Sequence, residues 1–284
     1  MLATINSLGV KGIGGYAVTV ESFVSNGLFN FDIVGLPDAA VKEARERVRA
    51  AIKCNGFKFP VSRVTVNLAP ADTKKAGTVY DLPIMLGILA ATGTIKQPGA
   101  FFGELALTGE LRPVNGALPM ALCAAREGIK KLFVPADNAE EAAYAEGVSV
   151  YPVKNVPELI AHLRGEQEIR PLPQGEISKS DVSYPDFSDV KGQENVKRAM
   201  EIAAAGGHNI LLVGPPGAGQ SMMSKRLPGI LPDMTREEML KCTEIYSVAG
   251  LTGKSNPIIA QRPFRAPGHR LPCPAAAQCR DRAR

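Results

Sequence analysis

Residues 209–221 read NILLVGPPGAGQS, an apolar run followed directly by a turn rich in glycine and proline. The run has the length of a buried strand, and helices are expected on either side, at 193–205 and from Gln220 onward. A strand, a phosphate-type loop and a helix in this order open the α/β domains that bind nucleotides. The segment therefore predicts an α/β fold with a buried strand at 209–213.

The turn matches the phosphate-loop pattern G-x-x-x-x-G-K-[ST] at every defined position except the lysine. Its residues are Gly214, Pro215, Pro216, Gly217, Ala218, Gly219, Gln220 and Ser221. The glycines let backbone N–H groups turn toward phosphate oxygens, and the dipole of the following helix favours the same anion. Ser221 is expected to ligate Mg²⁺ with the nucleotide, whereas Gln220 can donate a hydrogen bond but brings no charge. The alternative is a glycine-rich turn without a ligand, which the preceding apolar run argues against.

A working ATPase of this type also needs a later apolar strand that ends in acidic side chains, which hold Mg²⁺ and activate water. No segment after Ser221 has this pattern, and the nearest apolar run, 257–260, is followed by Gln261. The sequence therefore predicts nucleotide binding with deficient hydrolysis.

The first 165 residues alternate expected strands and helices, which is typical of an α+β domain. Strands are expected at 2–8, 16–24, 29–34, 63–68, 131–134 and 148–151, with a hairpin at 101–112. Helices are expected at 38–55, 82–91, 118–127, 137–146 and 156–164. The stretch after Arg164 contains three prolines and few bulky apolar residues, so 166–186 is interpreted as a linker.

The expected helix at 38–55 has an apolar face and, opposite it, a basic ridge made of Lys42, Arg45, Arg49 and Lys53. Such a ridge can grip the phosphates of nucleic acid. An ordinary solvated face, with ion pairs such as Glu43–Arg47, is the interpretation we favour from the sequence.

Composition limits the class of protein. The chain has 284 residues, 45% of them hydrophobic and 21% charged, and no apolar run reaches the roughly 18 residues of a membrane span. Five cysteines without close pairing favour a reducing compartment, so we expect a soluble cytoplasmic protein with no membrane partner. The net charge of +5 comes from residues 261–284, which carry six arginines and one aspartate. The basic pI is therefore no argument for nucleic-acid binding by the rest of the chain.

Five stretches together resemble the YifB/ComM family of magnesium-chelatase-like AAA+ ATPases. They are NSLGVKGIGGYAVTVE at 6–21, DIVGLPDAAVKEARERVRAAI at 32–52, NLAPADTKKAGTVYDLPI at 67–84, DFSDVKGQENVKRAMEIAAAGGHNILLVGPPGAG at 186–219 and RLPGILPDMTREEML at 226–240. The resemblance implies an N-terminal domain similar to the S5-like Lon protease domain, followed by an AAA+ module. It also implies ATP and Mg²⁺ as cofactors, a hexameric homo-oligomeric ring, and DNA as a partner through that ring. Val190 and Gly192 would lie against the adenine.

The resemblance assigns residues 1–165 to the Lon-like domain, 166–186 to the linker and 187–267 to the first part of the AAA+ module. Residues 268–284 depart from the family and are interpreted as a frameshifted tail, in which Cys273 and Cys279 are weak evidence for a metal pair. Gln220 also departs, since the family has lysine there.

A Lon-type protease domain needs a serine nucleophile and a lysine base. The turn at 75–81 offers Thr78 and Asp81 but no serine, and Leu118 stands where the resemblance places the base. The domain is therefore expected to be noncatalytic, and no catalytic residue is assigned. Three functions stay open: ATP-driven DNA remodelling in recombination or competence, an ATPase accessory to metal chelation, and a non-enzymatic fragment.

Overall fold

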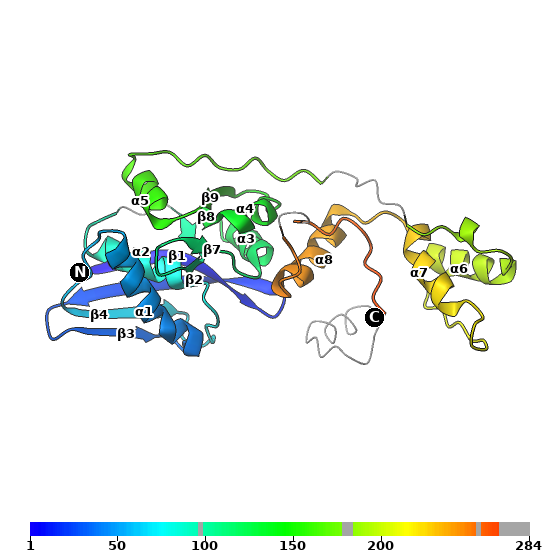
Figure 1. Ribbon diagram of the computed structural model, residues 1–284, viewed down its shortest axis with the longest axis horizontal. Coiled ribbons are helices and arrows are strands. Elements are labelled where there is room, and N and C mark those ends of the chain that lie inside the picture. Colours follow the sequence, from blue (N-terminus) through cyan, green and yellow to red (C-terminus); the bar gives the residue numbers. More distant parts are fainter. Residues whose placement is uncertain (96–98, 178–183, 254–256, 267–284) are drawn as a thin grey trace. The chain divides into compact units, whose positions relative to one another are not determined.

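The computed structural model describes residues 1–95, 99–177, 184–253 and 257–266, and the expected tail at 268–284 lies outside them (Figure 1). The chain divides into two compact units. Unit 1 contains Met1–Glu176 and Thr243–Pro257, and unit 2 contains Ile177–Cys242 and the residues from Ile258 onward. The domain bounds drawn from the sequence remain a prediction.

Unit 1 is built on a seven-stranded sheet in the order β3-β4-β2-β1-β5-β8-β9. The strands are β1 (Leu2–Lys11), β2 (Gly14–Ser25), β3 (Asn30–Val34), β4 (Arg63–Ala69), β5 (Ala100–Phe101), β8 (Lys131–Pro135) and β9 (Ser149–Val153). β2 runs antiparallel to β1 and β4, and the other neighbouring strands are parallel. The mixed α/β fold expected from the sequence is confirmed.

Five helices accompany this sheet: α1 (Ala39–Cys54), α2 (Asp81–Ala91), α3 (Ala117–Arg126), α4 (Ala136–Ala142) and α5 (Val156–Arg164). α2 and α3 pack on β1 and β2, while α4 and α5 pack on β9. α1 begins where the sequence predicts, because the Asp38 side chain accepts a hydrogen bond of 2.8 Å from the Val41 amide. Its buried residues recur at helical spacing and form the predicted apolar face.

The predicted hairpin at 101–112 is only partly correct. β6 (Glu104–Leu105) and β7 (Leu111–Arg112) pair as an antiparallel ribbon. Phe101 belongs instead to β5, which joins the main sheet between β1 and β8. The local sequence predicted the turn but contained no information about the distant strands that recruit Phe101.

The segment Thr243–Pro257 joins unit 1 although it is distant in sequence. The Gly116 amide donates to the Ser247 carbonyl over 3.1 Å. The buried Glu141 carboxylate accepts from the Leu118 amide at 2.9 Å and from the Thr252 hydroxyl at 2.7 Å. One carboxylate thus links the first turn of α3 to the C-terminal segment.

Unit 2 contains the short helix η1 (Phe187–Asp189), α6 (Glu194–Gly206) and α7 (Gln220–Ile230). The helix α8 (Arg236–Val248) belongs to unit 2 up to Cys242 and to unit 1 from Thr243. Val190, Met200 and Met223 form its small core. None of the helices in the described ranges is both long and apolar enough to cross a membrane.

The predicted buried strand at 209–213 is wrong. Ile210 and Leu212 pack against the small core, but Leu211 and Val213 are 85% and 86% exposed. No described strand pairs with this segment, and a strand forms only when a neighbour takes up its backbone hydrogen bonds. The apolar composition typical of a strand is present without that neighbour.

Candidate nucleotide-binding site

The loop before α7 has the backbone conformation that the glycine pattern predicts. Gly217 and Gly219 have φ values of 86° and 85°, in the left-handed region that other residues rarely adopt. Neither has an atom within 4 Å of where a Cβ would stand, so the backbone angle is what requires glycine. Gly219 is the N-cap of α7, so the unpaired amides of that helix begin directly after the loop.

The Gln220 side chain turns back toward the loop that precedes it. Its amide nitrogen donates to the Gly214 carbonyl over 3.2 Å and to the Leu212 carbonyl over 3.4 Å. Within the loop, the Ala218 amide donates to the Pro215 carbonyl over 3.1 Å. Gln220 therefore ties the two ends of the loop together with neutral hydrogen bonds and places no positive charge there.

Ser221 is exposed, and in the described part of the chain its hydroxyl has no hydrogen-bond partner. It stands in the first turn of α7, next to the amides that follow Gly219. A free hydroxyl at this position is compatible with the expected role toward Mg²⁺.

The two residues expected near adenine differ in their surroundings. Val190 is 6% exposed and packs in the small core with Met200 and Met223. Met223 belongs to α7 and stands two positions after Ser221. Gly192 has a φ of 70° and open space where a Cβ would stand. The structure thus connects Val190 to α7 through Met223, whereas Gly192 lies at an open turn.

Arg226 anchors the helix that follows the loop, and sequence reasoning missed it. Its guanidinium donates to the Asp186 carbonyl over 2.7 Å and pairs with the Asp189 carboxylate at 3.0 Å, so it ties η1 to α7. The arginine side chain is only 11% exposed. Its partners lie 37 and 40 residues away, and no local pattern marks such a contact.

The residues weighed for a protease site in unit 1 are engaged elsewhere. The Thr78 hydroxyl donates to Glu104 over 2.5 Å. The buried Asp81 carboxylate accepts two hydrogen bonds from Arg47, at 2.6 and 3.0 Å. Burial raises the pKa of Asp81, and the Arg47 guanidinium opposes that rise. Thr78 and Asp81 are therefore not paired as nucleophile and base.

Lys75 precedes Thr78 by three residues and is fully buried. Its ammonium donates to the carbonyls of Pro70 and Thr73. Burial lowers the pKa of Lys75. These contacts hold the turn at 70–75 and give the lysine a structural role. The noncatalytic character of this unit remains a prediction.

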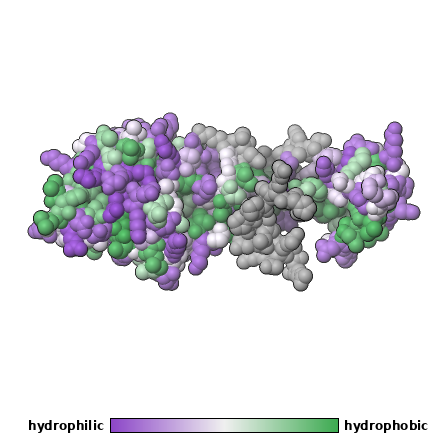
Figure 2. All heavy atoms as spheres, turned by 60° about the horizontal axis from the view of Figure 1, so that its bottom comes forward, coloured by the Kyte–Doolittle hydropathy of each residue, from purple (hydrophilic) through white to green (hydrophobic). Residues whose placement is uncertain are grey.

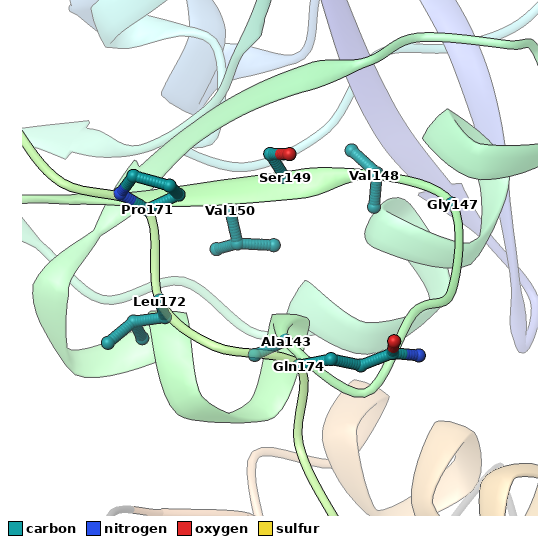
Figure 3. A pocket seen from close by; sticks show the side chains of 8 residues that line it. All are labelled: Ala143, Gly147, Val148, Ser149, Val150, Pro171, Leu172 and Gln174. Atoms are coloured by element: carbon teal, nitrogen blue, oxygen red, sulfur yellow. The ribbon is translucent and has the colours of Figure 1, made fainter.

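Other kinds of site find little support among the described residues. They contain no group of three or more histidine, cysteine or acidic side chains able to hold a metal, and Cys273 and Cys279 lie outside them. A pocket of about 280 Å³ lies beside β9, between Val150 and the segment at 171–174 (Figure 3). Its lining is mostly aliphatic and contains no charged side chain, so it is unsuited to phosphate.

Comparison with known proteins identifies the family. A family model described as subunit ChlI of Mg-chelatase matches residues 20–138, and one described as magnesium chelatase, subunit ChlI, matches residues 186–277. The uncharacterized protein YifB of Escherichia coli is 41% identical over 273 residues, covering 94% of this chain and 53% of YifB. Competence protein ComM of Haemophilus influenzae is 40% identical over 287 residues, covering 96% and 55%.

A more distant likeness concerns a protease. The Lon protease of Acinetobacter baumannii is 27% identical over 189 residues, covering 62% of this chain and 23% of that protein. This likeness is consistent with a Lon-like N-terminal domain. The chain spans about half the length of YifB and ComM. Because both family models describe the ChlI subunit of magnesium chelatase, and because YifB and ComM match 94% and 96% of this chain, the chain belongs to the YifB/ComM family of magnesium-chelatase-like AAA+ proteins.

Proposed function

We propose that this chain binds ATP with Mg²⁺ through the loop at 214–221. The observation that carries the proposal is the pair of left-handed glycines, Gly217 and Gly219, at the start of the eleven-residue helix α7. Successive amides at such a turn favour phosphate oxygens, and the helix dipole adds to the attraction. The loop backbone would hold the phosphates, Ser221 would face Mg²⁺, and Val190 and Gly192 would lie on the adenine side.

Binding is expected to be weak and turnover poor. Gln220 supplies no ammonium for the β- and γ-phosphates, and it already donates to two loop carbonyls. Charge-assisted hydrogen bonds are roughly twice as strong as neutral ones, so the loop lacks its strongest phosphate donor. Hydrolysis needs further charge stabilisation on the transferred phosphate, which a neutral glutamine does not provide.

Binding can be tested with a matched pair of glycine variants. Gly219→Ala forces alanine into a left-handed conformation at the loop, and Gly128→Ala does the same at a turn of unit 1 where φ is 72°. Both positions have open space around the added Cβ, so the two variants carry similar backbone strain. Equilibrium titration with a fluorescent ATP analogue should show weaker binding for Gly219→Ala only. Equal binding by both variants would refute the loop as the site.

For the whole protein we propose ATP-driven remodelling of DNA by a homo-oligomeric ring in the cytoplasm. The name of the relative ComM, a competence protein, supports a role in DNA uptake or recombination. An ATPase accessory to metal chelation is the second candidate, which the chelatase description of both family models favours. A full-length relative separates the two: stimulation of its ATPase by duplex DNA is expected for remodelling and not for chelation.

A further inference from the structure

The basic ridge of α1 is a second surface with a chemistry of its own. Lys42, Arg45 and Lys53 are exposed and Arg49 is partly exposed. At 1.5 Å per residue the ridge extends for about 16 Å along the helix. On the face of unit 1 drawn at the left of Figure 2, hydrophilic side chains predominate, with smaller hydrophobic areas between them.

Two of the arginines are fixed beside the edge strand β3. Arg45 donates to the Phe31 carbonyl over 3.3 Å. The Arg49 guanidinium lies over the Phe29 ring, 5.0 Å from its centroid. Phe59 contacts Phe29 nearly edge-on, with ring centroids 6.1 Å apart. The ridge and the aromatic side chain therefore form one ordered surface.

The aromatic part of this surface remains accessible. Phe29 is 46% exposed even though Arg49 and Phe59 contact it, and the neighbouring Leu28 is 93% exposed. Exposed aromatic rings offer stacking platforms for unpaired bases. Bases in a duplex are stacked on one another and cannot use such a ring.

Ion pairs do not neutralise the ridge. Within the described part of the chain, none of its four residues forms a salt bridge. The pair expected from the sequence, Glu43–Arg47, is present at 3.9 Å, but Arg47 lies outside the ridge and also binds Asp81. Glu46 borders the ridge, is exposed, and has no ion-pair partner among the described residues. The ridge thus keeps its charge for an external anion.

We propose that this surface binds single-stranded nucleic acid, with phosphates along the ridge and a base stacked on Phe29. The combination of cationic side chains and an exposed ring is the chemistry by which single strands are bound without sequence preference. The proposal does not depend on the loop at 214–221, so it can be tested without nucleotide.

The test uses the full chain and a fluorescein-labelled 15-nucleotide single strand, followed by anisotropy at several salt concentrations. Lys42→Ala/Lys53→Ala removes two charges from the ridge, and Lys130→Ala/Lys131→Ala removes two from exposed positions elsewhere in unit 1. If each ridge lysine contacts one phosphate, the double variant should lower the slope of log affinity against log salt concentration by about 1.4 in magnitude. Its affinity at 0.1 M salt should then fall by about 25-fold. The control pair should change little.

A second comparison tests stacking. Phe29→Ala should weaken binding at least fivefold, since stacking on an aromatic side chain is worth about 1–3 kcal/mol per base. Phe23→Ala is the matched control, because Phe23 is also about half exposed. Its neighbour Ser22 is buried, and side chains alternate along a strand, so Phe23 points to the face of β2 opposite to that of Ser22. Glu46→Gln should tighten binding, a gain that misfolding cannot produce.

Three results would overturn the proposal. The first is an absence of binding by the unmodified chain. The second is equal loss in the two lysine pairs, which would place the binding charge elsewhere. The third is a duplex that binds as tightly as the single strand with no effect of Phe29→Ala, which would leave a surface that recognises phosphates alone.

Discussion

Gln220→Lys should strengthen ATP binding to this chain without giving it an ATPase activity. The substitution replaces a neutral donor with an ammonium at the start of α7. The glutamine now donates to the Gly214 and Leu212 carbonyls at 3.2 and 3.4 Å, distances at the long end of the hydrogen-bond range. Little binding energy is therefore lost when the substitution removes these two glutamine hydrogen bonds and the new lysine turns toward a phosphate.

The size of the gain follows from the two kinds of hydrogen bond. A neutral hydrogen bond contributes about 0.5–1.5 kcal/mol and one to a charged group about 1.5–3 kcal/mol. The difference, about 1–1.5 kcal/mol, corresponds to roughly tenfold tighter binding. Turnover should not follow, because an acidic strand that holds Mg²⁺ and activates water is still needed.

The assay is titration of the full chain with Mg²⁺-ATP, together with steady-state phosphate release. Met222→Lys is the matched control, since it adds the same charge to an exposed side chain of the same helix, two residues along. Equal tightening by both variants would mean that general charge, and not a phosphate contact, is responsible. Steady-state hydrolysis by Gln220→Lys at the rate of an ordinary AAA+ enzyme would refute the reasoning on turnover.

Three further outcomes are expected. Limited proteolysis should cut first between Gly175 and Asp186, because Leu172 and Gly175 are still hydrogen-bonded to Val150 and Ala143; early cuts inside 20–150 would argue against two units. The full chain should not degrade an unstructured protein with or without ATP, and activity that disappears in Thr78→Ala would contradict this. Asp81→Ala should destabilise the protein by about 3 kcal/mol in urea unfolding, because Arg47 loses a buried partner. Glu43→Ala, which removes the exposed partner of the same arginine at 3.9 Å, should cost less than about 1 kcal/mol.

Local signals in the sequence predicted much of unit 1. The helix at 39–54 follows from Asp38 and from apolar residues at helical spacing, both of which act within a few turns. The buried helix α2 likewise follows from a continuous apolar run. The failed strand at 209–213 shows the limit, because strand formation depends on a neighbour that no local pattern encodes.

The site shows the same division between local and distant determinants. The left-handed glycines and the start of α7 follow from the residue pattern at 214–221. The return of Gln220 to its own loop depends on rotamer and backbone geometry, and the contacts of Arg226 join residues far apart in the chain. Residue types thus predicted the conformation of the loop and the start of α7, while the hydrogen bonds around them required coordinates.

The hydrogen bonds of Glu141 bear on the order in which the protein is made. Unit 1 is discontinuous in sequence, and Thr252 reaches Glu141 across 111 positions. A ribosome therefore completes the whole sheet and the linker well before it adds Thr252, whose hydroxyl donates a hydrogen bond to the second oxygen of this buried carboxylate. Until Thr252 emerges, that oxygen must be hydrated, since an unsatisfied buried acceptor costs about 1–3 kcal/mol. The nascent first unit should accordingly reach its full stability only after the segment up to residue 257 has been synthesised.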